Sequence, residues 1–262
     1  MILEYKKYGN GFPLIILHGL YGSGSNWYSI ASELNSYFTV YLPDLRNHGL
    51  SPHNDEINYN IMTTDIEEFF SYQNIEKANL IGHSMGGKLV MNFALKNPSK
   101  IEKLIIIDIA LRSYSVDGDF APQALVHRNI IDSLKTLDIK SSKSRSEIDQ
   151  KLAEHIKQRS IRQFLLKNLK RNENGDFYWG LNLHALDKNL YRMLDAIEFQ
   201  NRSFNGPVLV ISGKNSGYIN EEDKKDFKIA FPNMTFVEFD TGHWVQVEQT
   251  EKFVECIEKF LI

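Results

Sequence analysis

The stretch Leu80-Ile81-Gly82-His83-Ser84-Met85-Gly86-Gly87 is an apolar run that ends in a G-x-S-x-G turn. Residues 88–95 follow it with the spacing of a helix. A sharp turn between a strand and a helix lifts a serine to where a base can take its proton, and Gly82 and Gly86 leave that turn uncrowded. The stretch therefore predicts Ser84 as a nucleophile. An ordinary glycine-rich turn is the alternative, because the motif alone occurs often.

Apolar runs with strand character alternate with helical patterns along most of the chain. The runs are nearly continuous, which is typical of parallel strands that are covered on both faces. The alternation predicts an α/β fold, with a mostly parallel twisted sheet and helices on both sides. After a first strand in residues 1–7, the expected strands span residues 14–17, 38–42, 78–81, 104–107, 208–211 and 235–239, and the expected helices span residues 27–34, 61–70, 88–95, 222–230 and 253–261.

The alternation fails between residues 112 and 201, where charged and amphipathic segments contain no convincing strand run. Ile161, Leu165 and Leu169 lie at helical spacing, so we expect a mainly helical insert. A long insertion after a strand end is placed to cover a site as a lid. We therefore expect a core of residues 1–111 and 202–262 with a lid of residues 112–201. The lid residues expected to contact a substrate are Phe164, Leu165, Trp179 and Met193.

Composition excludes some classes of partner. The chain has 262 residues, a formal net charge of -3 and a pI near 6.3, so it lacks the basic surface that nucleic acid or an anionic membrane requires. No apolar run approaches the roughly 18 residues of a membrane span, and the first residues do not resemble a signal peptide. We expect a soluble, cytoplasmic protein of undetermined oligomeric state. The single cysteine, Cys256, is expected to pack in the core.

A nucleophilic serine needs a base, and His243 is the best placed of the eight histidines. It lies in Thr241-Gly242-His243-Trp244, directly after the last expected strand and before the last expected helix. We expect His18 to tie down its own loop rather than to act on a substrate. The remaining candidates, expected to be ordinary surface or core residues, are His127, His155 and His184.

The acid that orients the histidine is harder to assign. In a fold of this kind it usually follows the strand before the histidine's strand, but residues 212–218 contain no carboxylate there. A serine in this loop can hydrogen-bond an imidazole, but it cannot supply the charge that stabilises imidazolium. Asp108 ends the strand that follows the nucleophile. Active sites of open α/β sheets lie at the carboxyl ends of the strands, so we assign the acid to Asp108. Asp223, on an apparently solvated helix, and Asp240, three residues before His243, are weaker rivals.

Two backbone amides are expected to stabilise the oxyanion of a tetrahedral intermediate. One belongs to Met85, which follows the nucleophile, and the other to Leu20, in the loop after the early strand. In residues 43–51 we expect Asp44, Arg46 and His48 to pin a loop beside the site. A metal site at Asp44, His48 and His53 is the alternative, but these residues lack a recognised ligand spacing, so no metal is expected.

Together these motifs resemble the α/β-hydrolase fold superfamily over essentially all of the chain outside the insert. Residues 107–110 and 213–218 are similar to those of small bacterial YbfF-type esterases, in which the acid follows the strand after the nucleophile. In that group a serine at the usual acid position completes a four-residue arrangement, which matches Ser216 here. The chain departs from the group at Leu111, where the group has proline.

The resemblance implies hydrolysis of small acyl esters or acyl thioesters without a cofactor, with lid residues setting the acyl-chain preference. Ser84 would attack the acyl carbon, His243 would move the proton and Asp108 would orient His243. A carbon–carbon bond hydrolase and a cofactor-free peroxidase on the same fold are alternatives with the same triad. A further alternative is that the chain is a ligand-binding relative of these hydrolases with little turnover. Dehalogenases and epoxide hydrolases are disfavoured, because they resemble the fold with aspartate in place of Ser84.

Overall fold

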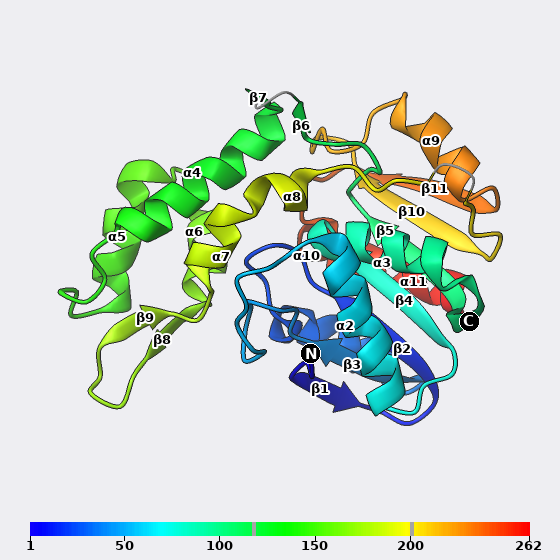
Figure 1. Ribbon diagram of the computed structural model, residues 1–262, viewed down its shortest axis with the longest axis horizontal. Helices are drawn as coiled ribbons and strands as arrows, with labels where there is room; N and C mark the ends of the chain where they lie inside the picture. Colours follow the sequence, from blue (N-terminus) through cyan, green and yellow to red (C-terminus); the bar gives the residue numbers. More distant parts are fainter. Residues whose placement is uncertain (117–118, 200–201) are drawn as a thin grey trace.

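A computed structural model describes residues 1–116, 119–199 and 202–262 and shows an α/β fold built on a seven-stranded sheet (Figure 1). The strand order is β1-β3-β2-β4-β5-β10-β11, and every neighbouring pair is parallel except β1 and β3. The strands are β1 (Tyr5–Tyr8), β2 (Phe12–Leu17), β3 (Phe38–Pro43), β4 (Ala78–His83), β5 (Ile101–Ile107), β10 (Val208–Gly213) and β11 (Met234–Phe239). The predicted mostly parallel sheet is confirmed.

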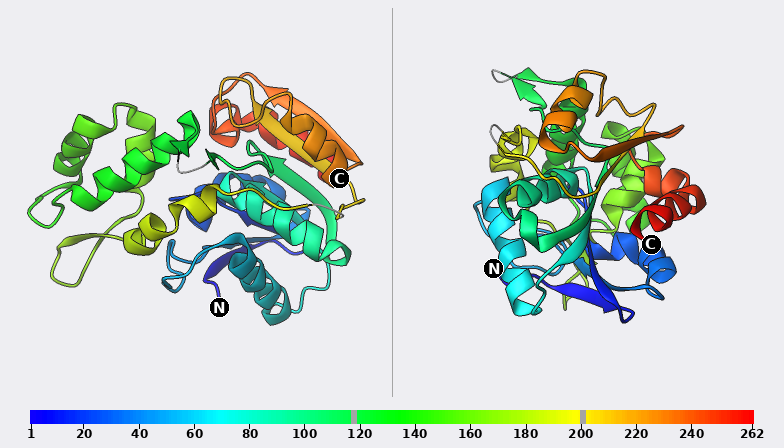
Figure 2. Two further views of the ribbon diagram at one scale, coloured as in Figure 1. Left: turned by 45° about the horizontal axis from the view of Figure 1, so that its top comes forward. Right: turned by 90° about the vertical axis from the view of Figure 1, so that its right-hand side faces the viewer.

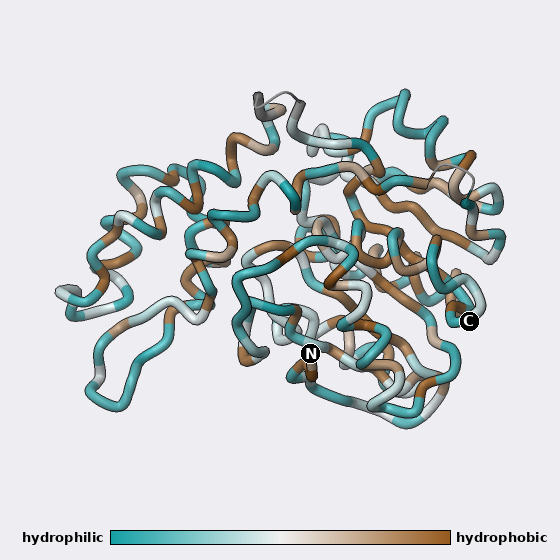
Figure 3. The backbone as a smooth tube through the Cα atoms, viewed as in Figure 1, coloured by the Kyte–Doolittle hydropathy of each residue, from teal (hydrophilic) through white to brown (hydrophobic). Residues whose placement is uncertain are grey.

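Helices cover both faces of the sheet (Figure 2). Two apolar clusters form there, one under α1 and α11 and the other under α2, α3 and α9. The strands between them are buried on both sides, which explains their continuous apolar runs (Figure 3). The helices are α1 (Tyr28–Leu34), α2 (Tyr59–Tyr72), α3 (Met85–Lys96), α9 (Asp223–Ala230), α10 (Val245–Glu248) and α11 (Thr250–Leu261), with short 3-10 turns η1 (Gly24–Trp27) and η2 (Pro98–Lys100). Cys256 on α11 is half-buried against this packing rather than deep in it.

The segment between β5 and β10 is mainly helical, and it stands beside the sheet in Figure 1. It also contains two short antiparallel strand pairs, so the expectation of no strand there is wrong. These strands are only two or three residues long, and therefore they are too short to give a recognisable strand run. The elements are β6 (Ser115–Val116), β7 (Asp119–Phe120), α4 (Pro122–Thr136), α5 (Arg145–His155), α6 (Arg159–Leu166), β8 (Leu169–Arg171), β9 (Phe177–Trp179), α7 (Leu183–Lys188) and α8 (Leu190–Leu194).

One buried lysine of the core bonds both connections of this segment. Lys88 lies in the first turn of α3, directly after the G-x-S-x-G turn, and it is 1% exposed. Its ammonium donates to the carbonyls of Arg112 at 2.8 Å and Asp195 at 2.5 Å, with a longer contact of 3.4 Å to Leu111. These carbonyls belong to the outgoing and the returning stretch of chain, so Lys88 joins both to the helix that carries the site.

None of the helices in the part of the chain that the structure describes has the length and apolarity needed to cross a membrane.

Candidate active site

Ser84 occupies a strained turn between β4 and α3. Its backbone has φ 54° and ψ -119°, in the left-handed half of the map that residues with a side chain rarely adopt. A Cβ at Gly82 would lie 2.2 Å from the carbonyl oxygen of Gly86, and one at Gly86 would lie 2.3 Å from that of Leu17. Both positions therefore require glycine, and this close packing of α3 on β2 and β4 is the physical content of the G-x-S-x-G motif.

Asp108 and His243 meet at the carboxyl end of the sheet. Asp108 is fully buried just beyond β5, where its φ is 49° and its amide donates to the Ile211 carbonyl at 2.7 Å. His243 follows β11, and its Nδ1 donates to Asp108 Oδ2 at 2.7 Å. Because Nδ1 is engaged, Nε2 is the ring nitrogen left for proton exchange. His243 lines a cavity together with Ser84.

Ser216 contacts the acid rather than the histidine. Its hydroxyl donates to Asp108 Oδ1 at 2.8 Å, and the Gly213 amide donates to the same oxygen at 2.9 Å. The notion that a serine in this loop bonds the imidazole is therefore wrong for this chain. Instead, the loop after β10 hydrogen-bonds one oxygen of the buried carboxylate, while the other oxygen faces His243. These contacts hold the carboxylate in a single orientation.

The two rival carboxylates have other partners. Asp223 is 3% exposed and pairs with Arg112 at 3.0 Å, so the expectation of a solvated position is wrong. It also accepts the Asn220 amide at 2.8 Å, in the turn that leads into α9. Asp240 is exposed and accepts from the Asn215 amide group at 3.1 Å. Of the three carboxylates, only Asp108 hydrogen-bonds the His243 ring among the contacts of the described residues.

His83 and Tyr218 hold His243 in place, and the sequence analysis predicted neither role. The His83 Nε2–H donates to the backbone carbonyl of His243 at 2.9 Å, which ties the histidine's loop to the residue beside the nucleophile. Burial lowers the pKa of His83 to about 3, so this ring stays neutral near pH 7. The Tyr218 ring stacks on His243 with centroids 4.0 Å apart and planes 20° apart. Position next to Ser84 is the one sequence signal that could have pointed to His83.

The loop that carries Leu20 is fixed by two buried histidines. His18 donates from Nδ1 to the Gly19 carbonyl at 2.8 Å, and its Nε2 accepts the Leu45 amide at 2.9 Å. His48 accepts the Tyr21 amide at 3.2 Å. Burial lowers the pKa of His18 to about 4 and that of His48 to about 3, so both are neutral partners. Within the described residues, no protein acceptor takes the amides of Leu20 or Met85.

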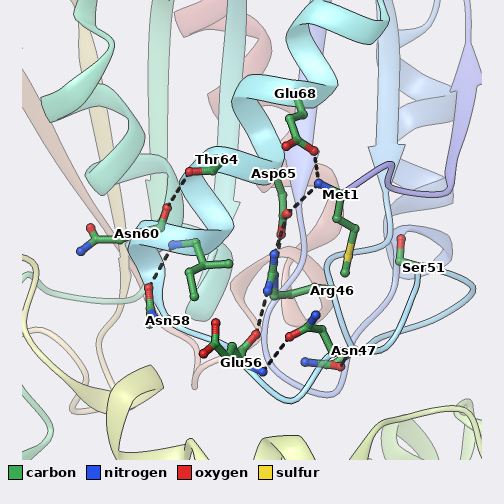
Figure 4. A network of polar contacts seen from close by, with 12 residues as sticks. Met1, Arg46, Asn47, Ser51, Glu56, Asn58, Asn60, Thr64, Asp65 and Glu68 are labelled. Carbon is green, nitrogen blue, oxygen red and sulfur yellow. Dashed lines mark hydrogen bonds and ion pairs between the residues drawn. The ribbon is translucent and has the colours of Figure 1, made fainter.

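The loop of residues 43–51 is pinned from the core side, as its polar residues predict. Arg46 makes a two-pronged contact with Asp65 of α2, at 2.5 and 2.7 Å, and also donates to the Glu56 carbonyl (Figure 4). Asp44 accepts the amides of Gly24 and Leu50 at 2.7 and 2.8 Å. The side chains of Arg46 and Asp44 thus both have structural partners.

Two cavities border Ser84. The larger is about 250 Å³ and is lined by His243, Ser216 and apolar side chains of α4 and α6, including Phe164 and Leu165. The smaller is about 20 Å³ and is lined in part by Met193. Trp179, although expected to contact a substrate, borders neither of the two; its indole N–H donates to the Leu134 carbonyl at 3.2 Å.

His127 also has a place in this region that its sequence position did not suggest. It borders both cavities, and its Nε2 lies 3.0 Å from the Tyr218 hydroxyl. Burial lowers the pKa of its ring to about 3. His155 and His184 are exposed, as expected for ordinary surface residues.

Comparison with known proteins agrees with this geometry. A family model described as alpha/beta hydrolase fold matches residues 13–250. The chain belongs to the α/β-hydrolase fold family. It is 38% identical over 266 residues to the sn-1-specific diacylglycerol lipase ABHD11 of Xenopus laevis, covering 99% of this chain and 83% of that protein.

Two further relatives are esterases by name. The chain is 30% identical to the esterase YbfF of Escherichia coli strain K12, with 96% of this chain and 94% of that protein covered. A solved structure titled "Marine microorganism esterase" is 42% identical, with a TM-score of 0.95 and 99% of both chains covered. The chain is thus an ester-bond hydrolase of the α/β-hydrolase superfamily, close to the YbfF-type esterases that its motifs resemble.

Proposed function

We propose that this ester-bond hydrolase cleaves small acyl esters or thioesters through a Ser84–His243–Asp108 triad and an acyl-enzyme intermediate. The observation that carries the proposal is the 2.7 Å contact between Asp108 Oδ2 and His243 Nδ1, which leaves the second ring nitrogen for a cavity shared with Ser84. No cofactor takes part in these steps. Residues 112–201 act as the lid over this site, and residues 1–111 and 202–262 form the core.

In the first half-reaction His243 Nε2 takes the Ser84 hydroxyl proton as Oγ bonds to the carbonyl carbon. The carbonyl oxygen becomes an oxyanion, and the amides of Leu20 and Met85 donate to it. The bond to the leaving group then breaks, and His243 gives its proton to the departing oxygen or sulfur. Asp108 supports the charged imidazolium during both proton transfers.

In the second half-reaction water takes the place of the leaving group. His243 removes a proton from the water as its oxygen attacks the acyl carbon, and the second tetrahedral intermediate uses the same two amides. The bond between Ser84 Oγ and carbon breaks, and the proton returns to Oγ. The products are the free acid and the resting enzyme, so hydrolysis needs no other reactant.

Ser216 acts in this scheme as a positioning residue. It does not touch the reacting atoms, but it and the Gly213 amide share one oxygen of Asp108, and so they keep the other oxygen directed at His243. A neutral hydrogen bond of this kind contributes about 1 kcal/mol. The loss of Ser216 therefore slows the reaction far less than the loss of Asp108.

Turnover of an ester panel, combined with a fluorophosphonate probe, tests the proposal. We expect hydrolysis of acyl esters or acyl-CoA thioesters and labelling of one serine per chain. A protein that binds the esters without turnover and resists the probe would be the ligand-binding relative. A protein that is labelled but hydrolyses only carbon–carbon bonds, or that supports only peroxide chemistry, would carry one of the other activities of the fold.

A further inference from the structure

The two cavities at Ser84 differ in size and exposure. The larger, of about 250 Å³, has exposed side chains in its wall, since Val126 of α4 and Val247 of α10 are 44% and 66% exposed. The smaller, of about 20 Å³, is bordered by eleven residues, of which all but His127 are buried. Ser84 and Leu20 border both cavities, so a substrate bound at the nucleophile extends into each.

The position of His243 decides which part of the substrate enters which cavity. The leaving group must lie beside His243, because that ring returns a proton to it. His243 borders the larger cavity and is not part of the wall of the smaller one. Met85, whose amide is assigned to the oxyanion, borders only the smaller cavity. The leaving group therefore extends into the larger cavity, and the acyl group extends the opposite way, into the smaller one.

Three polar side chains around the smaller cavity already have partners, whereas the buried Nδ1 of His127 has none among the described residues. The Tyr59 hydroxyl donates to the Met193 carbonyl at 2.6 Å, and the Tyr114 hydroxyl donates to the Tyr218 carbonyl at 2.6 Å. The Lys88 ammonium is bonded to the backbone carbonyls of the two connections. Apart from the His127 nitrogen, the cavity presents mainly aromatic and aliphatic surface to an acyl group.

We propose that the substrate carries a short, unsubstituted acyl group, acetyl or propionyl, in the smaller cavity and that its variable part is an apolar leaving group in the larger one. About 20 Å³ gives room for roughly one water-sized group beyond the carbonyl carbon. A longer acyl chain must displace buried side chains such as Met193 and Leu194, which overpacks the site. This inference rests on the proposed function, because it takes Ser84 and His243 as the reacting groups.

Two substrate series test the inference with the intact protein. In the first, 4-nitrophenyl esters keep one leaving group while the acyl chain grows from two to eight carbons; kcat/KM should fall about tenfold or more between acetyl and hexanoyl. In the second, acetates of primary alcohols with similar pKa grow from ethyl to octyl. Here kcat/KM should rise about two- to fourfold for each added methylene until the larger cavity is filled.

Two variants distinguish the contribution of each cavity to substrate preference. Met193→Ala enlarges the smaller cavity and should move the acyl optimum to longer chains, with the ratios in the acetate series unchanged. Phe164→Ala opens the larger cavity and should flatten the acetate series, with the acyl optimum unchanged. Met193→Leu nearly preserves the side-chain volume and serves as the control for Met193→Ala. The wild-type series alone decide the question if Met193→Ala does not fold.

An acyl series that rises from two to eight carbons would overturn the inference, and so would an acyl optimum that responds to Phe164→Ala and not to Met193→Ala. Either result leaves the proposed function intact, because turnover at Ser84 has then been observed. Absence of turnover in both series, together with absence of probe labelling, would instead remove the proposed function and the inference with it.

Discussion

The core and the insert contribute to the site in different ways. Core residues at the site are held by backbone geometry: Ser84 and Asp108 have positive φ, and the Asp108 carboxylate accepts the Gly213 amide. The insert contributes mainly apolar side chains to the larger cavity, such as Phe164 on α6. Geometry that is fixed by the backbone suits chemistry, which needs atoms placed within fractions of an ångström, whereas an apolar wall suits the selection of substrates by shape.

Polar anchors join these two regions without entering the chemistry. Side chains of the insert donate to backbone carbonyls of core loops, as Asn168 does to Tyr21 at 2.7 Å and Lys170 does to Gly49 at 2.6 Å. Tyr21 follows Leu20, so the position of the insert is coupled to the loop assigned to the oxyanion. Substitutions in the core should therefore change the rate for every substrate, and those in the insert should change the order of preference among substrates.

Removal of the nucleophile should have the largest effect. Ser84→Ala is expected to lower kcat by about 10⁶, because the triad has no other group that can form the acyl-enzyme. The fold should survive, as measured by circular dichroism and urea unfolding. Ser32→Ala, at an exposed position of α1, is the matched control. Activity of Ser84→Ala within tenfold of wild type would remove Ser84 from the mechanism.

Loss of the acid should have the next largest effect. Asp108→Asn is expected to lower kcat by about 10⁴, because His243 loses its countercharge and the control of its tautomer. Ser216→Asp in the Asp108→Asn variant should restore part of the rate, since the side chain at position 216 already points toward position 108, beside His243. Ser216→Ala alone should cost at most about tenfold.

The rival carboxylates provide the controls for this assignment. Asp240→Asn should leave kcat nearly unchanged, because Asp240 is exposed and contacts Asn215. Asp223→Asn should reduce stability through its pair with Arg112, with little change in kcat measured on the folded fraction. If Asp108→Asn stays active while either of these variants is dead, the acid is assigned to the wrong residue.

Acid should destabilise the core through its buried histidines. Burial lowers the pKa values of His48 and His83 to about 3 and that of His18 to about 4, whereas in the unfolded chain they lie near 6.5. Below pH 6.5 the unfolded state takes up protons that the folded state does not, so stability present above that pH is lost as pH falls toward 4.

Each such histidine contributes up to about 1.4 kcal/mol for each pH unit in this window. Urea unfolding between pH 7 and pH 4.5 measures the loss. His48→Gln should reduce the proton uptake by about one, and the exposed His155→Gln should leave it unchanged. Equal stability at pH 7 and pH 5 would show that these rings are not held neutral by the fold.

Substitution of Lys88 tests whether this residue holds the two connections between the core and the insert. Lys88→Met leaves the buried carbonyls of Arg112 and Asp195 without their donor, and we expect a loss of about 3 kcal/mol in the free energy of unfolding. Lys96→Met on the same helix removes an exposed ammonium and should cost much less. If the two variants are equally stable, Lys88 does not hold the connections.

The smallest effect is expected on substrate preference, and it should differ between two aromatic residues of the insert, Phe164 and Trp179. Phe164→Ala should change the relative kcat/KM of small and large leaving groups by several-fold, because Phe164 borders the larger cavity. Trp179→Ala should leave that ratio within about twofold of wild type, since Trp179 contacts Leu134 instead. If Trp179→Ala changed this kcat/KM ratio more than Phe164→Ala, the assignment of Phe164 rather than Trp179 to the larger cavity would be wrong.

The sequence predicted the elements that bury continuous apolar runs, and the candidate residues that it placed at strand ends lie together in the structure. It missed β8 and β9, since strands of three residues are too short to show a pattern in the sequence and are defined by their pairing with each other. It misplaced Asp223, because burial beside Arg112 depends on a partner 111 positions away in the chain. Contacts of this range have no local pattern, and they decide which of several similar residues is buried, paired or free.

The same limit applies to the substrate cavities. Phe164 and Met193 are both apolar residues of the insert, and nothing local separates the one that borders the larger cavity from the one that borders the smaller. The Met193 backbone is placed by the hydroxyl of Tyr59, a core residue 134 positions earlier. Specificity is therefore less predictable from sequence than chemistry, whose residues lie in short motifs.

Mass-spectrometric mapping of a small fluorophosphonate probe tests the central claim most directly, namely that the core alone performs the chemistry. We predict one phosphonyl group per chain, on the peptide that contains Ser84. The labelling rate should fall by several orders of magnitude in His243→Ala and Asp108→Asn, and should stay within a few-fold of wild type in Trp179→Ala. Labelling of a different residue, or an undiminished rate on Ser84 in His243→Ala, would contradict the account.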